Sequence, residues 1–205
     1  MYVSFRLIPA LLAAAFGAPS LGGAQAATFA SLAGASGLAV QRLDIDSPHS
    51  SIEFAVKFMG LSTVRGAFSE FGGTLMYDPA DVTRSSIAVV IRTASINTNV
   101  DVRDRDLRSR NFFDAEKYPL ITFTSTRVDR DGDRFTARGA FSMHGVTKEI
   151  SIPFTRLHPL SRDAWGNQRV GFLGHTTLNR KRSTGWPRSS APRTRCFRRP
   201  LPKRT

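Results

Sequence analysis

Apolar and polar residues alternate with a period of two along most of the chain between Gln41 and Asn179. Every second residue of 51–58 is apolar, and related alternation recurs later, in residues 71–77, 87–91, 121–125, 135–141, 150–154 and 170–174. Such alternation is typical of strands that bury one face. Tight turns such as Asp78-Pro79 and Asp131-Gly132 separate the segments. Together they predict an antiparallel all-β domain over residues 42–179, built as a sandwich or a closed barrel.

One stretch breaks this alternation. Between Thr98 and Arg110, charges of both signs alternate, which predicts a short charged helix with a solvated face. Phe112 and Phe113 follow directly. A helix that delivers two aromatic rings to one end of a barrel is either a lid or a plug that completes the core, and the spacing alone leaves both open.

The amino-terminal residues resemble an export signal. Arg6 precedes the apolar segment Leu7–Phe16, and Ala24-Gln25-Ala26 forms a small-x-small cleavage site. We therefore predict a signal peptide over residues 1–26, a flexible leader over residues 27–41, and a periplasmic or secreted protein. An uncleaved anchor is the alternative.

The net charge of +13 is concentrated at the carboxyl end. Residues 180–205 contain ten Lys or Arg and no Asp or Glu, together with four prolines that oppose regular strands. We expect this basic tail to lie outside the fold, either as a disordered segment or as the product of a shifted reading frame. Its functional alternative is a nucleic-acid or anionic-membrane binder. Because the rest of the chain is nearly balanced and carries an export signal, we expect no nucleic-acid partner.

Several motifs in the same order resemble the YceI-like family of polyisoprenoid-binding periplasmic proteins. They cover residues 43 to about 181 and are Leu43–Phe54, Gly66-Ala67-Phe68, Phe71-Gly72-Gly73, Leu107-Arg108-Ser109, Phe112-Phe113-Asp114, Tyr118-Pro119, Gly139 and His144–Lys148. The resemblance implies a lipocalin-like barrel of about eight strands whose cavity holds an isoprenoid chain, such as that of a quinone or a polyprenyl lipid. It also implies export and frequent dimerisation into a homodimer. Transient contact with a membrane surface is a separate expectation.

The chain departs from that family at two places. Asp106 stands where the family has a His before Leu-Arg-Ser, and Asn179-Arg180 leads into the basic tail rather than into a final strand. We therefore expect the closing strand to be missing. Its absence would leave an unpaired edge beside the opening strand.

An apolar tunnel is the predicted binding site. The chain has fifteen Phe, and ten of them are candidates for ligand contact: Phe54, Phe58, Phe68, Phe71, Phe112, Phe113, Phe123, Phe141, Phe154 and Phe172. His49 is the candidate for contact with a polar head group. No metal ligands or cofactor are predicted apart from the bound lipid, and we expect a binding protein with no catalytic residues. A hydrolase-like enzyme that uses His49 and Asp46 as an acid–base pair is the alternative.

Overall fold

The computed structural model describes residues 2–4 and 40–178, which form two antiparallel sheets. The seven-stranded sheet has the order β11 (Gln168–Gly174), β10 (Val146–Arg162), β9 (Arg134–Met143), β8 (Leu120–Asp131), β6 (Ser86–Arg92), β5 (Phe71–Tyr77) and β2 (Gln41–Asp44). The five-stranded sheet has the order β12 (Thr176–Thr177), β1 (Tyr2–Ser4), β3 (Ile52–Phe58), β4 (Ser62–Phe68) and β7 (Ile96–Asn97). Eight of these strands have seven residues or more, so the prediction of an antiparallel all-β fold of about eight strands is confirmed.

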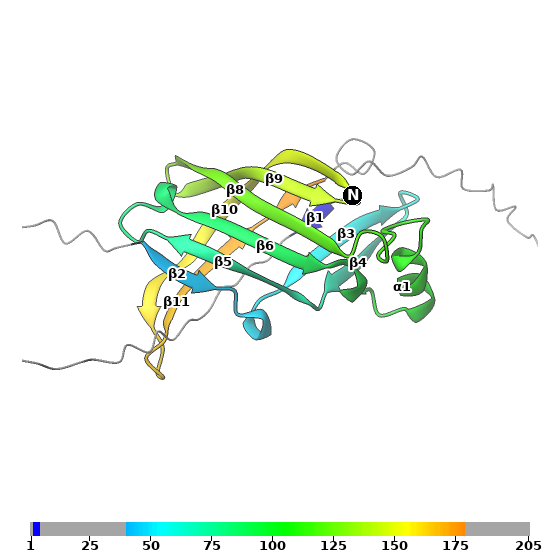
Figure 1. Cartoon of the computed structure of the whole chain (residues 1–205), viewed down its shortest axis with the longest axis horizontal. Coiled ribbons are helices and arrows are strands. Elements are labelled where there is room, and N and C mark those ends of the chain that lie inside the picture. The colour runs from blue at the N-terminus through cyan, green and yellow to red at the C-terminus, as the bar shows by residue number, and fades with distance from the viewer. Residues whose placement is uncertain (1, 5–39, 179–205) are drawn as a thin grey trace, which may run out of the picture.

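The two sheets form one curled wall because strands pass from one sheet into the other (Figure 1). β4 leads into β5, and β6 leads through a short 3-10 helix, η3 (Thr93–Ser95), into β7. The backbone bonds Ser69 N to Ser95 O (3.1 Å) and Arg92 N to Glu70 O (2.9 Å) carry the pairing around this bend. Two further 3-10 turns are η1 (Ser47–His49) and η2 (Val82–Arg84).

The barrel is incomplete along one side. β2 and β11 are the two outer strands of the seven-stranded sheet, and no backbone ladder joins them within residues 40–178. We call the junction between β2–β5 and β10–β11 the seam. These edges are open within residues 40–178, and the predicted loss of a closing strand concerns residues from 179 onward, which lie outside the described part of the chain.

β3, the strand that follows β2 in the chain, is paired on the side away from β4. β1 pairs antiparallel with Glu53–Ala55 of β3 and also with β12, so this stretch of the β3 edge is not unpaired in the structure. β1 falls within the predicted signal peptide. The rest of that peptide, the leader up to residue 39 and the basic tail lie outside the described residues.

The short charged helix, α1 (Asp101–Arg108), is fastened to the strand before it. Its Asp104 is buried and accepts hydrogen bonds from the backbone N (3.0 and 3.1 Å) and the hydroxyl (2.5 Å) of Thr98. Asp106 is exposed on the same helix. α1 has eight residues, and in the part of the chain that the structure describes no helix is long and apolar enough to span a membrane.

The segment after α1 completes the core instead of covering it. Phe113 is buried and packs edge-on against Phe68, with ring centroids 6.1 Å apart, and Phe68 in turn lies 5.7 Å from Phe54. Phe112 is half-buried against the same core. Of the two readings left open by the sequence, the structure supports the plug.

Gly139 permits β8 and β9 to approach closely at an irregular point of their pairing. A Cβ at this position would fall against the carbonyl oxygen of Thr124 and 2.6 Å from Ser125 Cα. The pairing register shifts immediately afterwards, between Ser125 and Arg127. Glycine is therefore required here by space rather than by an unusual backbone conformation.

Candidate ligand-binding cavity

An apolar cavity lies inside the wall, beside the seam. Strands from both sides of the seam contribute to it: β2 and β5 on one side, and β10 and β11 on the other. β6, β8, β9 and the 3-10 turn η2 supply most of the remaining wall. The lining residues are Asp44, Ile45, Leu75, Val82, Ser85, Ser86, Ile87, Val89, Phe123, Val128, Ala137, Ile152, Phe154, Phe172 and Gly174.

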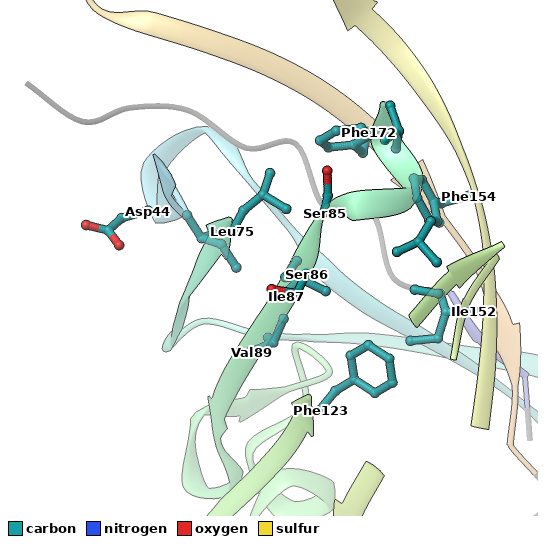
Figure 2. A pocket seen from close by; sticks show the side chains of 15 residues that line it. Asp44, Leu75, Ser85, Ser86, Ile87, Val89, Phe123, Ile152, Phe154 and Phe172 are labelled. Carbon is teal, nitrogen blue, oxygen red and sulfur yellow. The ribbon is translucent and has the colours of Figure 1, made fainter. Parts of the chain in front are cut away.

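Three of the ten predicted phenylalanines line this cavity. Figure 2 shows Phe123, Phe154 and Phe172 around one space together with aliphatic side chains. Phe154 and Phe172 sit on neighbouring strands, and their rings contact edge to face with centroids 5.6 Å apart. They form an aromatic wall at the seam.

The polar atoms of the lining are largely engaged elsewhere. The hydroxyl oxygen of Ser85 accepts a hydrogen bond from Asp78 N at 3.0 Å. The carboxylate of Asp44 accepts one from the Thr74 hydroxyl at 3.0 Å, and Figure 2 shows that this carboxylate points away from the other labelled side chains. Such a cavity suits hydrocarbon because a polar ligand would lose its hydrogen bonds to water without replacement.

The cavity is small in this structure, at about 80 Å³. Pockets that hold small molecules commonly measure roughly 300–1,000 Å³. The interior is therefore mostly filled by the chain's own side chains, and only a short piece of hydrocarbon fits without rearrangement. Three of the ten phenylalanines predicted to line a tunnel do line this cavity, and contact of the other seven with a ligand stays a prediction.

The other predicted phenylalanines occupy different environments. Phe54, Phe68, Phe113 and Phe141 are buried in the core and do not line the cavity. Phe71 and Phe112 are half-buried against that core. Phe58 is 56% exposed at the end of β3, because the strand there runs into the β3–β4 turn and its inward position has little to pack against.

Aliphatic residues form much of the lining, although the prediction from sequence named only phenylalanines as lining residues. Ile87, Val89 and Ile152 are examples. The signal was present: Ile152 lies two residues before Phe154 in β10 and shares its face, as residues i and i+2 of a strand do. The sequence pattern predicts which face of a strand points inward, but it does not predict where the inward side chains leave a cavity between them.

Charged side chains join the two sides of the seam. Asp46 Oδ2 lies 2.6 Å from His49 Nδ1 and 3.4 Å from Arg169 Nη1, and Arg169 belongs to β11. The predicted His49–Asp46 pair is therefore formed. Its His49 side chain is 66% exposed, and the Asp46 carboxylate is shared with the opposite side of the seam, as expected of a structural tie between strands.

The same arginine also reaches the β10–β11 turn, where its Nε donates to Asp163 Oδ2 at 2.7 Å. Partial burial raises the pKa of Asp163, but hydrogen bonds from Arg169, Asn167 and Trp165 outweigh this effect and lower the pKa to about 2. The carboxylate therefore remains charged at neutral pH and holds the turn.

Tyr77 forms a second contact across the seam. It is fully buried at the end of β5, its hydroxyl accepts a hydrogen bond from Arg156 Nη1 at 3.2 Å, and its ring lies 5.8 Å from that of Phe172. β5 and β10–β11 are thus joined by side chains where backbone pairing is lacking.

Comparisons with known proteins agree with this architecture. A UPF0312 protein of Pectobacterium atrosepticum is 37% identical over 73% of this chain and 77% of its own. The protein YceI of Escherichia coli O157:H7 is 37% identical over 71% of this chain and 77% of its own.

Solved structures and a family model also match this chain. The YCEI protein of Campylobacter jejuni is 30% identical, with a TM-score of 0.52 over 63% of this chain and 76% of that one. BcnA of Burkholderia cenocepacia shares the fold at 20% identity, with a TM-score of 0.53 over 64% of this chain and 99% of that one. The model of the YceI-like domain matches residues 43–183. The chain therefore belongs to the YceI-like family.

Proposed function

We propose that this protein is exported and binds the hydrocarbon chain of a polyisoprenoid, such as a quinone or a polyprenyl lipid, in the cavity beside the seam. The observation that carries the proposal is the cavity lining, in which Phe123, Phe154 and Phe172 are combined with aliphatic side chains. The engaged polar groups of Ser85 and Asp44 favour an apolar ligand over a polar one.

Burial of hydrocarbon supplies enough free energy without a polar anchor. Removing apolar area from water is worth about 25 cal/mol per Å², so a few hundred Å² of chain contributes roughly 5–10 kcal/mol before the cost of association. The affinity then depends mainly on how much of the chain the cavity encloses. This explains why the interior, rather than His49, is the proposed determinant of binding.

A long chain requires the cavity to widen, and the seam is the place where this costs least. β2 and β11 have no backbone ladder between them within the described residues. Separating them breaks a few side-chain contacts, namely Arg169 with Asp46 and Tyr77 with Arg156 and Phe172. Parting any other neighbouring pair of long strands would break a series of backbone hydrogen bonds. We therefore propose that the ligand enters at the seam.

The test of the carrier function is the lipid content of the protein itself. The full chain is exported from a bacterial host and purified, and its organic extract is examined by mass spectrometry. We expect a prenyl lipid in the extract of the wild type. Repeated absence of any prenyl lipid from a correctly folded sample would overturn the proposal.

Export has a separate test with a structural consequence. Sequencing of the exported protein is expected to place its first residue at Ala27. Cleavage there removes β1, so amide hydrogens of β3 that face β1, around Phe54, should exchange faster than in the uncleaved chain. Amides between β8 and β9 serve as the control and should be unaffected. Recovery of an exported chain that begins at Met1 would contradict the cleavage.

A further inference from the structure

The β10–β11 hairpin combines an inner end at the cavity with an exposed tip. Near its base, Phe154 and Phe172 line the cavity. At its tip, in the turn between Arg162 and Gln168, Trp165 is 81% exposed. Figure 1 shows this turn projecting beyond the barrel wall, at the end opposite the β3–β4 turn. The ligand cavity and an exposed tryptophan therefore share one element.

Hydrogen bonds fix the conformation of the turn at the tip. Asp163 Oδ1 accepts hydrogen bonds from the backbone N of Trp165 and of Asn167, both at 2.9 Å, and the backbone N of Asp163 donates to Asn167 O at 2.9 Å. Gly166 has φ +86°, a left-handed conformation that glycine adopts without strain. The fold thus presents a large indole to solvent at a fixed place.

The basic side chain next to the tip is Arg162, which is exposed at the end of β10. The other two arginines of the hairpin are engaged within the fold: Arg169 pairs with both Asp163 and Asp46, and Arg156 donates to Tyr77. Tryptophan prefers the boundary between lipid headgroups and hydrocarbon, and arginines near a membrane are attracted to anionic phospholipids.

We propose that the tip of the β10–β11 hairpin docks on an anionic phospholipid bilayer, with Trp165 in the headgroup region and Arg162 facing lipid phosphate. The inference rests on the proposed function, because docking through this hairpin brings the adjoining cavity to the surface from which a prenyl chain is taken. A bilayer fits better than a second copy of the chain. A stable protein interface buries roughly 1,200–2,000 Å² in total, which a narrow turn cannot supply.

The experiment follows the environment of Trp165 in the full chain. The sequence contains two tryptophans, so Trp186→Phe leaves Trp165 as the single reporter. Vesicles of phosphatidylcholine with phosphatidylglycerol are compared with vesicles of phosphatidylcholine alone, and brominated lipids serve as quenchers. We expect a blue shift and quenching of Trp165 with the anionic vesicles. Arg162→Gln should raise the lipid concentration at half-maximal shift about fivefold, as about 1 kcal/mol per basic residue implies.

The basic tail would also adsorb to anionic vesicles, so total binding is not the readout. A matched control places the reporter near the opposite end (Figure 1): Glu116, an exposed acidic residue in the segment after α1, is changed to Trp in a chain that also carries Trp165→Phe and Trp186→Phe. This reporter should stay in water. Equal insertion at both ends, an unchanged Trp165 spectrum, or a shift that depends on protein concentration without lipid would each overturn the docking.

The docking proposal and the carrier proposal can be overturned independently of each other. A chain that carries a prenyl lipid while Trp165 remains in water overturns the docking alone. A chain whose Trp165 inserts but whose extract contains no prenyl lipid supports the docking as a surface property and overturns the carrier proposal.

Discussion

Arg169 of β11 lies 3.4 Å from Asp46, which follows β2, so a charged contact joins the two outer strands of the seven-stranded sheet. The other side of the same guanidinium holds Asp163 in the β10–β11 turn at 2.7 Å. One side chain therefore ties the seam to the hairpin that carries the aromatic wall of the cavity. Changes at Arg169 should affect both the closure of the barrel and the order of that hairpin.

Arg169→Gln tests the tie across the seam. The substitution removes the charge that Asp46 and Asp163 share, so the seam should open more readily. We expect a lower midpoint of thermal unfolding and faster release of a bound prenyl chain, measured by transfer to acceptor vesicles. Arg127→Gln is the matched control, since Arg127 forms an exposed pair with Asp129 away from the seam. Equal release rates for the two variants would contradict a role for the seam in ligand exchange.

Asp163 predicts a particular dependence of stability on pH. Its pKa is about 2 in the folded chain, below the ordinary value of 3.8. The group therefore stabilises the fold fully above pH 3.8, and this stabilisation is lost as the pH falls through 2. Urea unfolding should show wild type more stable than Asp163→Asn at neutral pH, with the difference shrinking towards pH 2. A difference that stays constant over this range would contradict the assignment.

Two phenylalanines on the neighbouring strands β3 and β4 allow the stability effect of a buried ring to be compared with that of an exposed one. Phe68 is 6% exposed and contacts two other aromatic rings, whereas Phe58 is 56% exposed. Phe68→Ala should lower the free energy of unfolding by about 3–5 kcal/mol. Phe58→Ala should change it by less than about 0.5 kcal/mol, as exposed positions commonly do. Similar losses in chemical denaturation would show that the end of β3 is packed in solution.

Gly139 and Gly72 form a second matched pair, because both lie within strands. A Cβ at Gly139 meets the backbone of β8, whereas a Cβ at Gly72 has no atom within 4 Å. Gly139→Ala should lower the free energy of unfolding by about 1–3 kcal/mol through overpacking. Gly72→Ala should leave it nearly unchanged. The comparison is made by urea denaturation, and equal stability of the two variants would rule out the close approach of β8 and β9.

The sequence predicts the strands well because a half-buried strand marks its faces at every second residue. β3 and β9 follow their predicted alternation, and α1 falls within the predicted charged helix. The cavity was harder to predict. Phe54 and Phe154 occupy equivalent inward positions in the pattern, yet only Phe154 lines the cavity. Periodicity identifies the side that faces inward, whereas the space between opposing side chains depends on how the strands curl together.

β1 shows another limit of sequence interpretation. Tyr2–Ser4 belongs to a segment whose composition predicts an export signal, and nothing in three residues announces a pairing with β3 and β12. That pairing depends on edges made by residues far along the chain. Long-range complementarity of this kind leaves no local pattern.

The most direct test of the cavity as a prenyl-chain site is a titration of the ligand-free protein with the prenyl alcohol geranylgeraniol. Ala137→Phe places a ring in the cavity, and Ala140→Phe places the same ring on the exposed face of β9. We predict saturable binding by the wild type and Ala140→Phe, and loss of binding by Ala137→Phe with an unchanged far-UV circular dichroism spectrum. Failure of the folded wild type to bind, or equal binding by all three proteins, would contradict the account.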